Sequence, residues 1–152
     1  MPATIEQDTL TIRFARRIQA TPERVFDAWT KPDHLSEWWD PTGERLESCD
    51  VDLRVGGAFC FRNKHHSPAF AGTYVEITPP HRLVFEALGA VGTVLLEAKG
   101  AETQMEVTIR CASAEHFEQF VSIGVAENTD ITLDNLVRHV SGASAVQHAE
   151  QP

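Results

Sequence analysis

The sequence predicts an α+β fold in which a curved antiparallel sheet of seven strands wraps around a long C-terminal helix, with two short helices after the first strand. Three observations predict it. Short apolar runs separated by turn residues fill the middle of the chain. Two such runs in residues 72–86 meet at Pro79-Pro80, which indicates a β-hairpin. An apolar stripe at helical spacing follows Ser113.

The first strand is expected at residues 10–18, where Leu10, Ile12 and Phe14 recur with the period of a strand that has one buried face. Strict alternation then places Arg16 on the buried face as well. Two explanations stay open. The strand contains a β-bulge near its end, or the guanidinium faces a cavity and holds a polar group of a ligand.

Two short helices are expected next. The hydroxyl of Thr21 can cap the first helix by accepting hydrogen bonds from free N–H groups, and Pro22 suits the first turn. Pro32 opens the second helix and Pro41 ends it. The apolar stripes are Val25, Phe26 and Trp29 in the first helix and Leu35, Trp38 and Trp39 in the second.

Further strands are expected at residues 46–53, 58–62, 70–77, 82–86, 93–99 and 104–111. Tight connections at Gly56-Gly57, Pro79-Pro80 and Gly100 favour antiparallel pairing of successive strands in a meander. Apolar residues alternate with polar ones in 105–111, which predicts a sheet that is covered on one face only.

The cover is expected to be a single helix of about 25 residues, capped by Ser113 and nearly 40 Å long. Its stripe comprises Phe117, Phe120, Val121, Val125, Leu133, Leu136, Val137 and Val140. The polar residues 128–132 lower helix propensity, which makes a kink or bulge there an expectation. The domain is expected to span 9–141, with a flexible N-terminus at 1–8 and a frayed tail at 142–152.

Length and charge bound the function. The 152 residues suit one domain. The net charge of -9 argues against a nucleic-acid or anionic-membrane partner. Three cysteines without a CxxC pair, and an N-terminus without signal-peptide features, favour the cytoplasm. No apolar run approaches the roughly 20 residues that span a bilayer, so membrane insertion is not expected.

Five segments carry a resemblance to a known family. They are TPERVFDAWTKPDHLSEWWDP, VDLRVGGAFCFR, GTYVEITPPHRLVFE, SAEHFEQFV and LDNLVRHV. Their order and spacing resemble bacterial single-domain proteins related to the activator of the ninety-kilodalton heat-shock chaperone's ATPase, in the START-like (SRPBCC) helix-grip superfamily. The resemblance covers residues 9–140 and implies the helix-grip fold. It also implies either a small-molecule ligand or a chaperone partner in the stress response.

The chain departs from these relatives at one place. Where they often carry a Gly-Trp pair in the last helix, this chain has Asn128 and Thr129. A short hydroxyl side chain in place of a large aromatic is expected to enlarge or polarise a cavity under the helix. The alternative is that neighbouring side chains refill the gap.

A helix that crosses a concave sheet often leaves an apolar cavity, which is the expected ligand site. Strand parity leaves the direction of Tyr74 ambiguous, and all of the candidates also suit a plain core. The candidate ligand-binding residues are Trp38, Trp39, Phe59, Phe61, Tyr74, Phe85, Leu96, Phe117, Phe120, Val121, Val125, Thr129 and Arg16.

Catalytic and metal motifs are weak. Neither a GxSxG elbow nor an HExxH helix occurs, and Gly56-Gly57 is interpreted as a turn. His65 and His66 are interpreted as an exposed loop rather than metal ligands, since adjacent strand residues point to opposite faces. Asp50 and Asp52 suit a solvated edge better than an acid and base pair. No catalytic residue, metal or cofactor is expected.

His34 is interpreted as a surface residue. His139 lies near a helix C-terminus, where the helix dipole favours a cation.

Three functions stay open. The leading one is non-enzymatic binding of a small hydrophobic or aromatic molecule. The second is a chaperone-ATPase activator-like interaction domain. The third is an enzyme like polyketide cyclases and aromatases, which would need Arg16, Tyr74, Glu86 or Glu97 aimed into the cavity. A homodimer is compatible with each of them.

Overall fold

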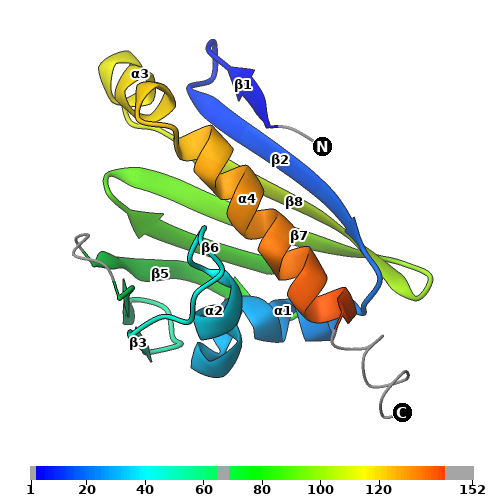
Figure 1. Cartoon of the computed structure of the whole chain (residues 1–152). Coiled ribbons are helices and arrows are strands. Elements are labelled where there is room, and N and C mark those ends of the chain that lie inside the picture. Colours follow the sequence, from blue (N-terminus) through cyan, green and yellow to red (C-terminus); the bar gives the residue numbers. More distant parts are fainter. Residues whose placement is uncertain (1–2, 65–68, 143–152) are drawn as a thin grey trace.

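The computed structural model describes residues 3–64 and 69–142. Within them lies an antiparallel sheet of eight strands in the order β1-β2-β8-β7-β6-β5-β4-β3 (Figure 1). The strands are β1 (Thr4–Glu6), β2 (Thr11–Ile18), β3 (Ser48–Val51), β4 (Ala58–Arg62), β5 (Phe70–Thr78), β6 (Arg82–Ala87), β7 (Ala90–Lys99) and β8 (Glu102–Arg110). Strands β3 to β8 form the predicted meander, and β8 then pairs with β2.

The predicted α+β helix-grip fold is confirmed, with one strand more than expected. The additional strand β1 pairs with β2 through Ile5 and Ile12, and Glu6 accepts a hydrogen bond from Arg13 Nε at 3.0 Å. It lies within residues 1–8, where the sequence predicts only a flexible N-terminus. Three residues are too few for a recognisable alternation, which is why the pattern did not reveal this strand.

The predicted hairpin is confirmed as β5 and β6, with a cis peptide bond between Pro79 and Pro80 in the turn. The pairing register shifts between Tyr74 and Glu76. The extra residue, Val75, is exposed, and Tyr74 is buried. This irregularity explains why strand parity alone left the direction of Tyr74 ambiguous.

Helices α1 (Pro22–Thr30) and α2 (Pro32–Trp38) follow β2 as expected. Thr21 caps α1, and its hydroxyl oxygen accepts a hydrogen bond from the Arg24 N–H at 3.4 Å. Both apolar stripes face the core. Their fully or largely buried members are Val25, Phe26, Trp29, Leu35 and Trp38, while Trp39 is half-buried.

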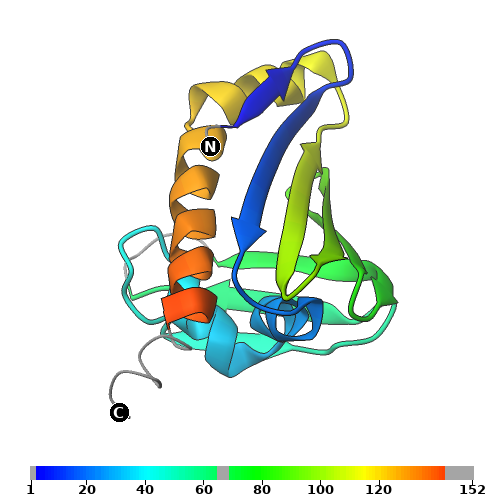
Figure 2. The same cartoon turned by 90° about the vertical axis from the view of Figure 1, so that its right-hand side faces the viewer.

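The C-terminal helix is not continuous as predicted but is divided into two helices. The segment forms α3 (Ala114–Ser122) and α4 (Val125–Val137), followed by a π-helical turn η1 (Arg138–Gly142). Gly124 separates them in the left-handed conformation, with φ of 87°, which glycine adopts without steric cost. Helix α3 therefore lies at an angle to α4, which crosses the concave face of the sheet (Figures 1 and 2).

Residues 128–132, where a kink or bulge is expected, are α-helical throughout, and the segment is broken at Gly124 instead. Tertiary contacts, including the ion pair of Asp130 with Arg16, offset the low intrinsic helix propensity of these residues. The predicted cap is confirmed, since Ser113 Oγ accepts a hydrogen bond from the His116 N–H at 3.1 Å.

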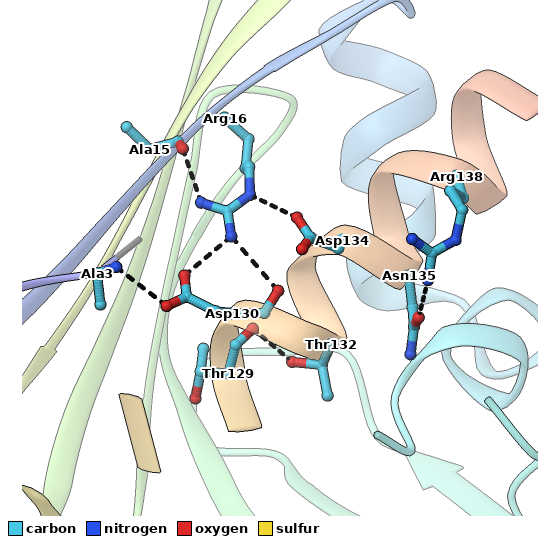
Figure 3. Close-up of polar contacts among 9 residues, drawn as sticks. All are labelled: Ala3, Ala15, Arg16, Thr129, Asp130, Thr132, Asp134, Asn135 and Arg138. Carbon is cyan, nitrogen blue, oxygen red and sulfur yellow. Dashed lines mark hydrogen bonds and ion pairs between the residues drawn. The ribbon is translucent and has the colours of Figure 1, made fainter. Parts of the chain in front are cut away.

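Arg16 joins β2 to α4 (Figure 3). Its pairing with Met105 continues the regular register of β2 and β8, so the β-bulge explanation is wrong. The side chain is 7% exposed, and it donates hydrogen bonds to Asp130 Oδ1 at 2.9 Å and to Asp134 Oδ1 at 3.1 Å. Asp130 also accepts a hydrogen bond from the Ala3 N–H at 3.0 Å. One cluster thus connects the residue before β1, strand β2 and helix α4.

A histidine pair holds the other end of α4. His34 Nδ1 lies 2.9 Å from His139 Nε2, which ties α2 to η1. His34 is half-buried, so its interpretation as a surface residue is wrong. Burial lowers the pKa of His139 below its ordinary value, and the charges of His34 and Arg24 lower this pKa further. The predicted preference for a cation at this helix end is therefore wrong as well.

We expect Arg16→Met to lower the free energy of unfolding by about 2 kcal/mol, because it removes the buried guanidinium that bonds the partly exposed carboxylates of Asp130 and Asp134. Arg17→Met is the matched control. Arg17 neighbours Arg16 on β2 but points outward and pairs with Glu102 at the surface, so its loss should cost less than about 1 kcal/mol. Urea denaturation measures both variants. Equal losses would show that the Arg16 cluster does not anchor α4.

We expect the free energy of unfolding to fall as the pH drops from about 7.5 to about 5.5. Because the pKa of His139 is lowered in the folded state, the unfolded chain binds a proton first, and stability rises with pH across this window. His139→Gln should flatten this dependence. A slope that survives His139→Gln would contradict the assignment.

Candidate ligand-binding cavity

A cavity of about 250 Å³ lies between α4, the two short helices and the sheet. Helices α1 and α2 contribute Trp29, Trp38 and Trp39, and helix α4 contributes a strip from Val125 to Leu133. The sheet and its hairpins supply Phe70, Phe85, Ala87, Leu88, Ala90, Gly92, Val107 and Ile109. The wall is therefore apolar on every side except for three residues of α4.

The structure brings together some of the predicted site residues and separates others. Those among the described lining residues are Trp38, Trp39, Phe85, Phe120, Val125 and Thr129. Phe59, Phe61 and Tyr74 line an adjoining space of about 10 Å³, next to Trp39 and Phe85. Leu96, Phe117, Val121 and Arg16 line neither space.

Aromatic rings pack together where the cavity meets the adjoining space. The ring of Trp39 lies 5.0 Å from those of Phe61 and Phe70, and the rings of Phe59 and Tyr74 are 5.1 Å apart. Such tilted and edge-to-face contacts stabilise aromatic clusters beyond the area that they bury. Burial also raises the pKa of Tyr74 to about 12, so its phenol stays protonated and neutral.

The buried tryptophans present apolar surface to the cavity because their polar atoms are already bonded. Trp38 Nε1 donates to the carbonyl oxygen of Ala28 at 2.9 Å, and Trp29 Nε1 lies 3.4 Å from Met105 Sδ. A ligand therefore meets the rings of these two residues rather than an unsatisfied N–H group.

A glycine allows Phe85 to lie flat against the neighbouring strand. Phe85 on β6 pairs directly with Gly92 on β7. A Cβ atom at Gly92 would lie 2.6 Å from Phe85 Cζ, closer than two carbon atoms can approach. Both residues line the cavity, so this close approach sets the shape of its wall on the side of the sheet.

Sequence reasoning missed several lining residues. Trp29, Phe70, Val107, Ile109 and Leu133 were assigned to the core or left unassigned, because a core residue and a cavity wall have the same hydrophobic pattern. The lining residues of α4 carried a usable signal. They recur at helical spacing on one face of α4, so the position of Thr129 was enough to identify its neighbours on that face. These residues are Val125, Asn128, Thr129, Thr132 and Leu133.

No ionisable side chain is among the described residues that line the cavity. Glu86 and Glu97 are exposed, and Arg16 is bonded to α4. Asp50 and Asp52 are exposed at the β3 edge of the sheet. Burial raises the pKa of Cys49 to about 11, which keeps its thiol protonated. The lining can therefore bind a molecule but offers no acid or base of its own for proton transfer.

Metal ligands do not gather in the part of the chain that the structure describes, where no three His, Cys, Asp or Glu side chains form a group suited to an ion. His65 and His66 lie outside the described residues.

Comparison with known families matches this geometry. A family model described as "Activator of Hsp90 ATPase homolog 1-like protein" matches residues 19–141, which include α1, α2 and every strand of the meander. The chain belongs to this family. The matched residues include those that line the cavity, the partners of Arg16 on α4, and His139. Arg16 itself lies just before the first matched residue.

Solved structures share the fold. A protein from Nitrosomonas europaea has a TM-score of 0.81 at 19% identity, over 90% of this chain and 97% of that one. A Mycobacterium smegmatis protein has a TM-score of 0.78 at 18% identity, over 94% and 98%. An AHSA1-like protein from Aeromonas hydrophila has a TM-score of 0.69 at 26% identity, over 87% and 94%.

The comparison with curated proteins found no match for the chain. Among the described residues, no helix has the length and apolar character needed to cross a membrane.

We expect Gly92→Val to lower the free energy of unfolding by about 2 kcal/mol, because the new side chain overlaps the ring of Phe85. In a Phe85→Leu background the same change should cost less than half as much, since the ring is gone. Denaturant unfolding of the four members of this double-mutant cycle measures the coupling. Additive losses would show that the two residues do not constrain each other.

Proposed function

We propose that this protein binds a small hydrophobic or aromatic molecule, without catalysis, in the cavity between the sheet and α4. The observation that carries the proposal is the cavity of about 250 Å³ with its apolar wall. An apolar cavity of about 150 Å³ inside a protein is large enough to bind benzene. The present cavity has room for a somewhat larger ring system.

The position of Thr129 supports the proposal. By the family resemblance, an aromatic residue often stands here in relatives, and in this chain the position lines the cavity. A short side chain at this place leaves volume that an indole would occupy. The alternative, in which neighbours refill the gap, would leave no space of this size.

A second candidate function is stimulation of a chaperone ATPase, as part of a stress response. The family description favours it, because it names an activator of the Hsp90 ATPase. The test adds the purified protein to the ATPase over a range of concentrations. Dose-dependent stimulation would support this function, and an unchanged rate would reject it.

The cytoplasm remains our proposed compartment, since all three cysteines are free. A homodimer remains a prediction.

Native mass spectrometry tests the binding function directly. The protein is purified gently from its own host, and any bound molecule is released and identified. A stoichiometric small molecule of apolar or aromatic character supports the proposal. A ligand that is highly charged and hydrophilic contradicts it, because the lining offers no counter-charge.

We expect Thr129→Trp to weaken the binding of naphthalene at least about tenfold, because the indole fills the cavity. Ile131→Trp is the matched control, since Ile131 is an exposed residue two positions along the same helix. Isothermal titration calorimetry measures both affinities, and circular dichroism verifies that both variants are folded. Unchanged affinity in a folded Thr129→Trp variant would place the site elsewhere.

A further inference from the structure

The polar part of the cavity wall lies on a single element. Three of the lining residues are polar, and all of them belong to one face of α4: Asn128, Thr129 and Thr132. Asn128 is exposed, so it lies at the edge of the cavity, whereas both threonines are half-buried. A ligand therefore meets hydrogen-bonding groups on its α4 side and only apolar groups on the opposite side.

The two threonines differ in what they can still bond. Thr132 Oγ1 donates its proton to the carbonyl oxygen of Thr129 at 2.9 Å (Figure 3), which leaves its oxygen as an acceptor only. The hydroxyl of Thr129 takes part in no hydrogen bond with the described residues. It can both donate and accept. Thr129 is therefore the residue best placed to bond a polar group inside the cavity.

Charge limits the ligand further. None of the described lining residues carries a charge, and the buried cation of the fold, Arg16, is neutralised by Asp130 and Asp134. Moving an ionised group from water into apolar surroundings without a partner costs many kcal/mol. A carboxylate ligand therefore has no compensation here, whereas one neutral hydroxyl or carbonyl group has Thr129.

Size and wall chemistry complete the description. A volume of about 250 Å³ exceeds the roughly 150 Å³ that accommodates benzene, and it suits one ring with substituents or two fused rings. The rings of Trp39, Phe70 and Phe85 offer edges and faces to an aromatic ligand.

We propose that the cavity selects neutral aromatic molecules of one or two rings that carry a single hydroxyl or carbonyl group, and that Thr129 bonds this group. The inference rests on the proposed ligand-binding function and specifies its ligand class. Thr129 is in this view the specificity-determining residue, with Thr132 as a second acceptor.

Three probes of similar shape test this selectivity: 1-naphthol, naphthalene and 1-naphthoate. Isothermal titration calorimetry measures each with the natural protein and with Thr129→Val, which keeps the shape of the side chain but removes the hydroxyl. Thr73→Val is the matched control, because Thr73 is exposed on β5 and does not line the cavity. Circular dichroism verifies that the variants are folded.

We expect 1-naphthol to bind about fivefold to tenfold more tightly than naphthalene, the difference of one net hydrogen bond. Thr129→Val should remove this difference by lowering the affinity for 1-naphthol to that for naphthalene, while Thr73→Val should preserve the difference. Binding of 1-naphthoate should be at least about a hundredfold weaker than that of 1-naphthol.

The outcomes separate the two proposals. Equal affinities for 1-naphthol and naphthalene, unaffected by Thr129→Val, would overturn the selectivity while the binding function stands. Tight binding of 1-naphthoate would overturn the preference for neutral ligands alone. If none of the three probes binds the natural protein, the selectivity and the proposed binding function both fail.

Discussion

Polar contacts on both flanks of α4 hold this helix over the sheet, and the cavity depends on them. On the β2 side, Arg16 bonds Asp130 and Asp134. On the α2 side, Asn135 Nδ2 donates to the carbonyl oxygens of Trp38 and Asp40 at 3.4 and 3.2 Å. Because these contacts position the helix, the apolar side chains beneath it do not have to fill all the space to keep it there. The unfilled volume is the candidate ligand site.

Two tryptophans of the cavity wall have their polar atoms satisfied within the protein. The indole N–H groups of Trp29 and Trp38 already have partners, and Phe85 rests against Gly92. A close-packed aromatic wall changes shape little when a ligand enters, so selection by size and shape follows from the core packing itself. Among the described lining residues, the polar side chains all belong to α4.

The distribution of charged residues supports the proposed binding of a small uncharged molecule. The chain has a net charge of -9, yet no described residue that lines the cavity is ionisable. Of the described acidic residues, only Asp40 is buried, and it accepts hydrogen bonds from Thr42 and Asn63. Asp130 and Asp134 pair with Arg16. The described lining is thus uncharged inside an acidic protein, which supports the proposed preference for uncharged molecules. The second proposed function, contact with a chaperone ATPase, would use the outer surface instead.

The sequence by itself determined the β5–β6 hairpin, the two short helices and the meander, because periodicity, caps and turn residues act over a few neighbouring positions. The family was identified by the resemblance of five segments to known proteins. The same resemblance also singled out Thr129. Only the tertiary structure decided that Arg16 binds α4, that His34 meets His139, and that Gly124 rather than residues 128–132 breaks the C-terminal helix. These contacts join residues more than a hundred positions apart, or depend on the packing of one whole helix against the sheet. Local patterns carry no such information, which is why core and cavity wall looked alike in the sequence.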